Sequence, residues 1–197
     1  MTSEIPIFPL RTVLFPDGLL PLKIFEQRYL DMTKACIRDN SPFGVCLIRE
    51  GGEVGEPALP FQVGCTARIA EWDMPHLGMF HLLCRGERVF RIVEHWTGKN
   101  GLVSALVQER EPALRDALPA DFQELGALLG RIIDQVGAES FPAPVLLDDA
   151  QWVGCRLSEA LPLDPEVKQR LLEAGSAHQR LEQLKALLKD KSVTIGE

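Results

Sequence analysis

The chain has 197 residues, of which 46% are hydrophobic and 25% are charged, enough to bury a sizeable core in one domain or two small ones. Its formal net charge is −7, and its basic residues are scattered rather than grouped into the stripe that a nucleic-acid binder uses. No apolar run is long enough for a membrane-spanning helix, and the N-terminus shows no secretion signal. We therefore expect a soluble, cytoplasmic protein without DNA or membrane partners.

The first half consists of short apolar runs separated by turn residues, which predict six or so strands and one helix. The helix is expected over Glu26 to Arg38, where apolar residues recur at helical spacing. Gly86-Glu87 predicts a tight hairpin between two strands. Prolines in the first two runs indicate strand edges or bulges rather than central positions. The strand candidates are 5–10, 19–24, 43–48, 63–69, 79–84, 88–93 and 102–107.

The pattern changes at Glu111-Pro112, and we expect two subdomains, 1–112 and 113–197. Because the first shows no alternation of strand and helix, it predicts an antiparallel barrel or rolled sheet. In the second, apolar residues follow the helical period from Phe122 to Val136. The fold class is thus α+β, with a C-terminal helical bundle.

Three further helices are predicted in that bundle. One covers Asp149 to Ala160. Another opens at Asp164-Pro165, with the aspartate at the N-cap and the proline at the first helical position. The last follows Ser176, which has capping-box spacing with Gln179.

Five cysteines are widely spaced beside apolar or small neighbours, and none forms a CxxC pair. An odd number in this pattern favours reduced core thiols over disulfides or a zinc site. The cysteines are Cys36, Cys46, Cys65, Cys84 and Cys155.

We find no catalytic set and expect no cofactor. The spacings of a phosphate-binding loop and of a nucleophile elbow do not occur. His81 and Cys84 are three apart on one predicted strand and should face opposite sides. Glu71 and Asp73 would share a strand face, which we interpret as a solvated strand end rather than an acid–base pair.

A recognition surface is the remaining candidate. The segment from Trp72 to Phe80 is predicted to be a loop and is rich in methionine and aromatic residues, which suit adaptable contacts. The alternative is that this loop packs on the helical half, and Phe141 is open to the same two interpretations. The candidate binding residues are Met74, Leu77, Met79, Phe80 and Phe141.

Several segments resemble the N-terminal domain of Lon proteases. The opening of the chain carries Pro-Leu, Phe-Pro and Pro-Leu pairs followed by Phe25-Glu26-Gln27-Arg28-Tyr29. Residues 63–69 resemble the family's central strand, and 85–92 resemble its Gly-x-x-Arg-Phe hairpin. Leu161-Pro162-Leu163 and Arg180-Leu181 also match. The resemblance covers nearly the whole chain.

This resemblance implies a PUA-like β-barrel followed by a helical bundle. It also implies recruitment of unfolded or tagged polypeptides, while a separate ATPase and a Ser-Lys peptidase perform the chemistry; a chain ending at Glu197 is expected to lack both. The matched residues look structural: Phe25 and Tyr29 are expected to pack, and Arg28 to anchor a turn or an acid. The prolines Pro9, Pro16 and Pro21 are expected to shape the chain.

Our leading hypothesis is a non-enzymatic polypeptide-binding protein, acting as an adaptor in proteolysis or protein quality control, with a protease as a second partner. The alternative is a PUA-like module that binds a small molecule or RNA. An enzyme ranks third, because it has no motif to support it.

Overall fold

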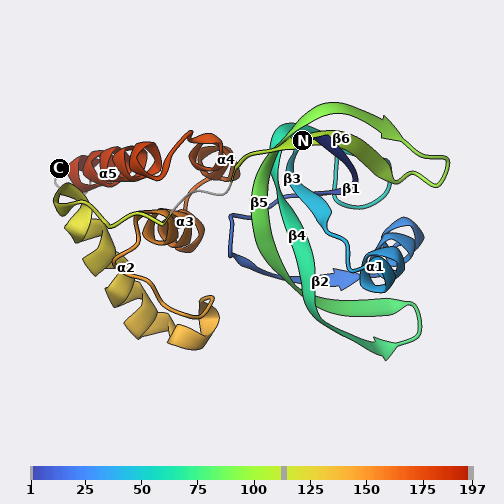
Figure 1. Cartoon of the computed structure of the whole chain (residues 1–197), viewed down its shortest axis with the longest axis horizontal. Coiled ribbons are helices and arrows are strands. Elements are labelled where there is room, and N and C mark those ends of the chain that lie inside the picture. Colours follow the sequence, from blue (N-terminus) through green and yellow to red (C-terminus); the bar gives the residue numbers. More distant parts are fainter. Residues whose placement is uncertain (1, 112–114, 195–197) are drawn as a thin grey trace. The chain divides into compact units, whose positions relative to one another are not determined.

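The computed structural model describes residues 2–111 and 115–194, with side chains through residue 189. The chain divides into two compact units, Met1–Glu111 and Pro112–Glu197 (Figure 1). The elements of the first unit are β1 (Thr2–Leu10), β2 (Leu19–Ile24), α1 (Gln27–Asp39), β3 (Phe43–Glu50), β4 (Leu59–His76), β5 (Met79–Thr97) and β6 (Val103–Glu109).

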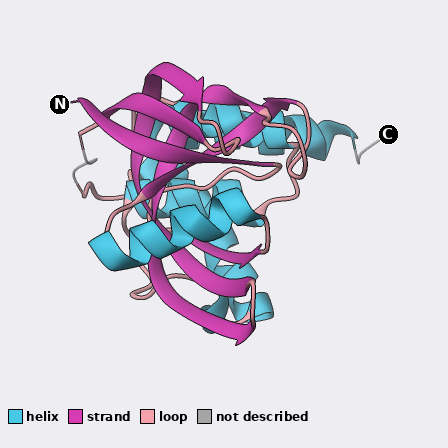
Figure 2. Cartoon of the chain, turned by 90° about the vertical axis from the view of Figure 1, so that its right-hand side faces the viewer, coloured by secondary structure: helices cyan, strands magenta, loops and turns pink. Residues whose placement is uncertain are grey.

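The six strands of the first unit form one mixed sheet in the order β2-β5-β4-β3-β1-β6. β5 also pairs with β6, so the sheet curls back on itself, and its strands are strongly curved (Figure 2). We expected an antiparallel barrel or rolled sheet; the sheet is curled, but it is neither wholly antiparallel nor regular. β1 and β3 run parallel, and the β3–β4, β4–β5 and β5–β6 ladders contain register shifts.

The parallel pair follows from the connection between its strands. Two parallel neighbours need a crossover rather than a tight turn, and here β2 and α1 lie between β1 and β3 in the chain. Because α1 is amphipathic, it can cover the sheet while it makes this crossover. Helix α1 agrees with the predicted range to within one residue at each end.

Two clusters of buried side chains form the core of the first unit. The larger one joins α1, through Tyr29, Leu30, Met32 and Cys36, to strands β1 to β5. Phe8 lies against Tyr29 there, with ring centroids 4.0 Å apart. The smaller cluster is made by β1, β3, β5 and β6 around Phe90.

β5 is one continuous strand of 19 residues, so the hairpin predicted at Gly86-Glu87 is wrong. The backbone N–H of Gly86 donates to the Gly18 carbonyl at 2.9 Å, and the Asp17 N–H donates to the Gly86 carbonyl at 2.8 Å. A Cβ on Gly86 would collide with the Phe15 carbonyl oxygen. Glycine is therefore needed here for close approach of the preceding segment, and not for a turn.

The second unit is helical, and the helix α3 contacts α2, α4 and α5. Its buried apolar side chains include Leu129, Val153, Leu171 and Leu181. The elements are η1 (Ala120–Phe122), α2 (Gln123–Val136), η2 (Ala138–Ser140), α3 (Ala150–Ala160), α4 (Pro165–Glu173) and α5 (Ala177–Thr194).

Three of these helices begin within one residue of their predicted starts. The Asp149 side chain accepts a hydrogen bond of 2.7 Å from the Trp152 N–H at the start of α3. Pro165 is the first residue of α4. The Ser176 hydroxyl accepts from the Gln179 N–H before α5, at 3.2 Å. Local sequence thus specifies these starts.

Candidate functional site

The segment that we predicted to be a loop, from Trp72 to Phe80, is instead the end of a long β-hairpin. β4 and β5 pair from Val63 opposite Arg91 to His76 opposite Met79. Only Leu77 and Gly78 form the turn, and Gly78 has a φ of 83°, a conformation that glycine adopts without strain. Residues 72–76 and 79–80 are therefore held in strands rather than in a free connection.

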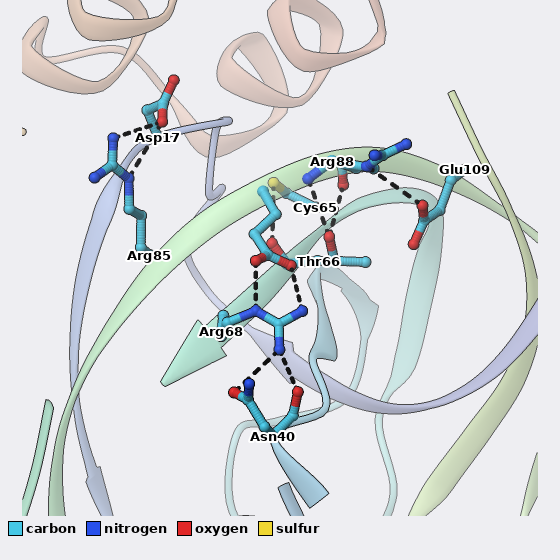
Figure 3. Close-up of polar contacts among 9 residues, drawn as sticks. Asp17, Asn40, Cys65, Thr66, Arg68, Arg85, Arg88 and Glu109 are labelled. Carbon is cyan, nitrogen blue, oxygen red and sulfur yellow. Dashed lines mark hydrogen bonds and ion pairs between the residues drawn. The ribbon is translucent and has the colours of Figure 1, made fainter. Parts of the chain in front are cut away.

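Ion pairs and hydrogen bonds anchor the hairpin where it leaves the core. Arg68 of β4 donates from Nε to Glu87 of β5 at 2.5 Å, and from Nη1 to the backbone carbonyl of Asn40, the C-cap of α1 (Figure 3). On the neighbouring part of β5, Arg85 donates to the Asp17 carboxylate at 2.7 Å (Figure 3). The base of the hairpin is thus tied to α1 and to the chain before β2.

Beyond this base, apolar side chains lie on the surface. Every residue from 70 to 78 is exposed. Trp72 is 53% exposed, Met74 44% and Leu77 98%. Monomeric proteins rarely gather large exposed apolar residues without a function, so this end of the hairpin is the candidate site.

Phe25 adds to the same end of the sheet. Ile24, the last residue of β2, pairs with Phe80 of β5, which brings the next residue, Phe25, beside the hairpin. Phe25 is 54% exposed, so the packing that we expected for it covers only about half of its surface. We call the set Phe25, Trp72, Met74 and Leu77 the hairpin patch.

The candidate residues differ in accessibility. Met79 is half-buried, and Phe80 is only 5% exposed within the larger core cluster. The ring of Phe80 lies edge-on to that of Trp72, with centroids 5.9 Å apart. Phe80 therefore packs beneath Trp72, and Trp72 is the more accessible of the two side chains.

Arg28 confirms both parts of its expected role. It is buried, and its guanidinium donates to Glu26 at 2.9 Å and to the backbone carbonyl of Gly101 at 3.2 Å. It also lies over the Tyr29 ring, 4.7 Å from the centroid. Arg28 thereby fixes the start of α1, just after Phe25, to the turn between β5 and β6.

Phe141 belongs to the second unit, where it is half-buried at the C-cap of η2. The same unit holds a feature that sequence reasoning missed, a largely apolar cavity of about 290 Å³ between α4 and α5. Val167, Leu171 and Leu187 line it, with Arg170. Helical periodicity alone cannot separate a residue that lines such a cavity from one that fills a core.

The thiols and histidines do not assemble a reactive centre. All five cysteines are free and buried, as predicted. Burial raises the pKa of Cys84 to about 12 and also raises the pKa of Cys46, which disfavours the nucleophilic thiolate. His81 is exposed and Cys84 is buried on the same strand, so the two do face opposite sides. Within residues 2–111 and 115–194, no group of three potential metal-ligating side chains comes together.

None of the helices described here is both long enough and apolar enough to span a membrane.

Comparison with curated proteins finds relatives that are much longer than this chain. Lon protease 2 of Herpetosiphon aurantiacus is 26% identical in an alignment 195 residues long that covers 95% of this chain and 24% of the relative. Lon protease 2 of Myxococcus xanthus is 34% identical over 92 residues, 46% of this chain and 11% of that protein. The chain spans about a quarter of the first of these relatives.

Solved structures agree with this relationship. The Lon N-terminal domain protein from Xanthomonas campestris has a TM-score of 0.80 and 38% identity, and the match covers 93% of this chain and 98% of that one. The N-terminal domain of Mycobacterium avium complex Lon protease has a TM-score of 0.65 and 19% identity, covering 91% and 95%; that likeness shows the fold alone. A family model for the ATP-dependent protease La (LON) substrate-binding domain matches residues 4–190. The chain therefore belongs to the Lon substrate-binding domain family.

Proposed function

We propose that this chain binds unfolded or otherwise exposed polypeptide segments through the hairpin patch. The observation that carries the proposal is the exposure of Trp72, Met74 and Leu77 at the end of an anchored hairpin, in a chain of a family described as substrate-binding. Binding, rather than a chemical reaction, would be the activity of this chain.

The physical argument rests on what an unfolded client offers. Its apolar side chains are exposed to water, and covering apolar surface stabilises a complex by about 25 cal/mol per Å². Trp supplies a large rigid surface, and Met adapts its shape to different partners. A patch of this composition would accept many sequences at modest affinity, as a client-recruiting domain requires.

Anchoring of the hairpin base supports the same proposal. The contacts of Arg68 and Arg85 hold the strands that carry the patch. A client therefore meets side chains on an ordered backbone, and ordering the binding site costs little free energy on association.

The proposal extends to protein quality control. We propose that the chain acts as an adaptor that holds clients for a protease, and that it works in the cytoplasm, where its five buried thiols would stay reduced. The longer relatives carry the name Lon protease, which makes a Lon-type protease the partner to test first.

Titration of fluorescein-labelled, reduced and carboxymethylated α-lactalbumin, which cannot refold, tests the binding site by fluorescence anisotropy. We expect saturable binding, and a loss of roughly tenfold or more in affinity for Trp72→Ala combined with Leu77→Ala. The matched control is Val54→Ala, which removes an exposed apolar side chain from a loop of the same unit. Native α-lactalbumin should not bind. Equal affinity of the wild type and the double variant would refute the assignment of the site.

The adaptor role needs a separate measurement. Degradation of the labelled client by a purified Lon protease is followed with and without this chain at saturating concentration. An increased rate that the hairpin double variant does not produce supports an adaptor. An unchanged or lower rate, with client binding intact, rules out the adaptor role and leaves a binding protein.

A further inference from the structure

The outer half of β4 has a free edge. β3 pairs with β4 only between Leu59 and Ala67, whereas β5 accompanies β4 to His76. From Ile69 to His76, β4 therefore has a strand neighbour on one side only, within the part of the chain that the structure describes. Figure 1 shows this hairpin extending past the end of β3. Backbone N–H and C=O groups on such an edge can pair with another extended chain.

This edge has two chemically different faces. Trp72 lies opposite Leu82 and contacts Phe80, so it is on the apolar face. Glu71 lies opposite Leu83 and Asp73 opposite His81, which puts both carboxylates on the other face. The sequence pattern predicted this shared face, and both carboxylates are exposed.

The two carboxylates are available to a partner. In the described part of the chain neither forms an ion pair, and Asp73 accepts only a local hydrogen bond from the Met74 N–H, at 2.8 Å. The same face carries His81 on β5 and then Lys23 on β2. These two lie across the sheet from the free edge, so a chain added at that edge would have Glu71 and Asp73 as its nearest charges.

We propose that the β4 edge from Ile69 to His76 receives a client segment as an additional β-strand, and that it prefers segments in which apolar and basic residues alternate. The apolar side chains would lie beside Trp72, and the lysines or arginines beside Glu71 and Asp73. Opposite charges directly across a strand pair stabilise it, and like charges destabilise it. This inference rests on the proposed function and specifies the conformation and charge of the client.

The carboxylates also argue against other occupants of this edge. If two copies of the chain paired through it, their carboxylates would be brought together, so self-association is disfavoured. The outer strand β2 is a weaker acceptor, because Pro21 in its middle has no N–H to donate. The β4 edge is free of proline until Pro75, next to its end.

Short fluorescein-labelled peptides test the inference at low salt by anisotropy. One alternates valine with lysine, and the second alternates valine with glutamate. A third is the lysine peptide N-methylated at every residue, which keeps its charge but removes the N–H donors of both strand edges. A fourth has the composition of the first in two blocks. We expect the alternating lysine peptide to bind roughly tenfold more tightly than each of the others, with the preference over the glutamate peptide shrinking as salt is added.

Charge reversal of the edge supplies the matched protein variants. Glu71→Lys with Asp73→Lys should invert the preference, so that the glutamate peptide binds more tightly. The control, Glu56→Lys with Glu94→Lys, changes net charge equally at two exposed positions elsewhere in the unit and should keep the wild-type preference. Thermal unfolding of each variant checks that it folds.

The outcomes separate this inference from the proposed function. Strand addition would be overturned if the lysine peptide and its N-methylated form bound equally well. It would also be overturned if the edge variant and the control variant both came to prefer the glutamate peptide. If the unfolded α-lactalbumin still bound through Trp72 and Leu77, the proposed function would survive that result. If no peptide bound while the unfolded protein did, strand addition would be refuted in the same way.

Discussion

The two halves of the β4–β5 hairpin belong to one ladder of paired strands but differ in how deeply their side chains are buried. In the near half, Val63 and Cys65 of β4 and Phe90 of β5 are buried in the core. In the far half, β4 is exposed from residue 70 onward. Strand pairing alone therefore does not bury a hairpin. The near half contributes to folding through its packing, and the far half is the part to which we assign the proposed binding.

Truncating a core ring in the near half should produce the largest loss of stability. Phe90→Ala removes a side chain with no exposed surface, which costs about 3–5 kcal/mol of unfolding free energy through lost burial and a cavity. Val93→Ala, at an exposed position of the same strand, is the control and should change little. Urea denaturation followed by tryptophan fluorescence measures both. A loss below about 1 kcal/mol for Phe90→Ala would contradict the division into two halves.

Glycine-to-alanine substitutions should also destabilise the near half more than the far half, by smaller amounts than Phe90→Ala. At Gly86, in the near part of β5, an alanine Cβ would meet the Phe15 carbonyl oxygen and approach Leu14 Cγ to 3.1 Å. We expect Gly86→Ala to lower the unfolding free energy by about 1–3 kcal/mol, because the backbone must shift. A stability change near zero would mean that the segment before β2 can move away without cost.

At Gly78, at the end of the far half, the loss of unfolding free energy should come from backbone strain alone. Nothing lies within 4 Å of a Cβ on Gly78, but its φ is 83°. We expect Gly78→Ala to cost about 1 kcal/mol, through left-handed strain without a clash. Gly78→Asn is the matched variant, because asparagine tolerates this conformation better. If alanine proved more costly here than at Gly86, the comparison would be reversed.

The smallest effect on stability is expected at the tip. Leu77→Cys should change the unfolding free energy by less than about 0.5 kcal/mol, because Leu77 is 98% exposed. At pH 8 roughly a quarter of an exposed thiol is ionised, so iodoacetamide should label it quickly, and faster as the pH rises.

The five native cysteines serve as an internal control for the labelling at position 77. With its pKa raised to about 12, Cys84 would be ionised in roughly one molecule in ten thousand at pH 8, and all five cysteines are buried. Peptide mapping should therefore find label at position 77 long before it appears elsewhere. Early labelling of Cys65 or Cys84 would show that the near half opens easily.

Sequence reasoning succeeded where local chemistry decides the structure. The caps at Asp149 and Ser176 satisfy backbone N–H groups within a few residues, and the face of α1 follows from helical spacing. It failed at Gly86, because a glycine required by close approach of a distant segment looks the same in sequence as a glycine required by a turn. The parallel β1–β3 pair is likewise a matter of long-range topology.

The candidate site was found in sequence but given the wrong structure. Met74 and Leu77 were chosen for composition, and both lie exposed at the hairpin end. The strands there were not recognised, because polar and apolar residues alternate only from Glu71 to Met74 before Pro75 and Gly78, which are typical of a loop. The burial of Phe80 and the exposure of Phe25 could not be predicted either, because both depend on where β2 ends against β5.

The two-residue turn at Leu77 and Gly78 makes this end of the molecule tolerant of insertions. Leu77 is 98% exposed, and no described atom lies within 4 Å of a Cβ placed on Gly78. The contacts of Arg68 and Arg85 secure the hairpin at its other end. Residues can therefore be added or exchanged there without disturbing the buried part of the sheet. The turn is therefore a natural position for grafting a peptide epitope or a fluorescent reporter.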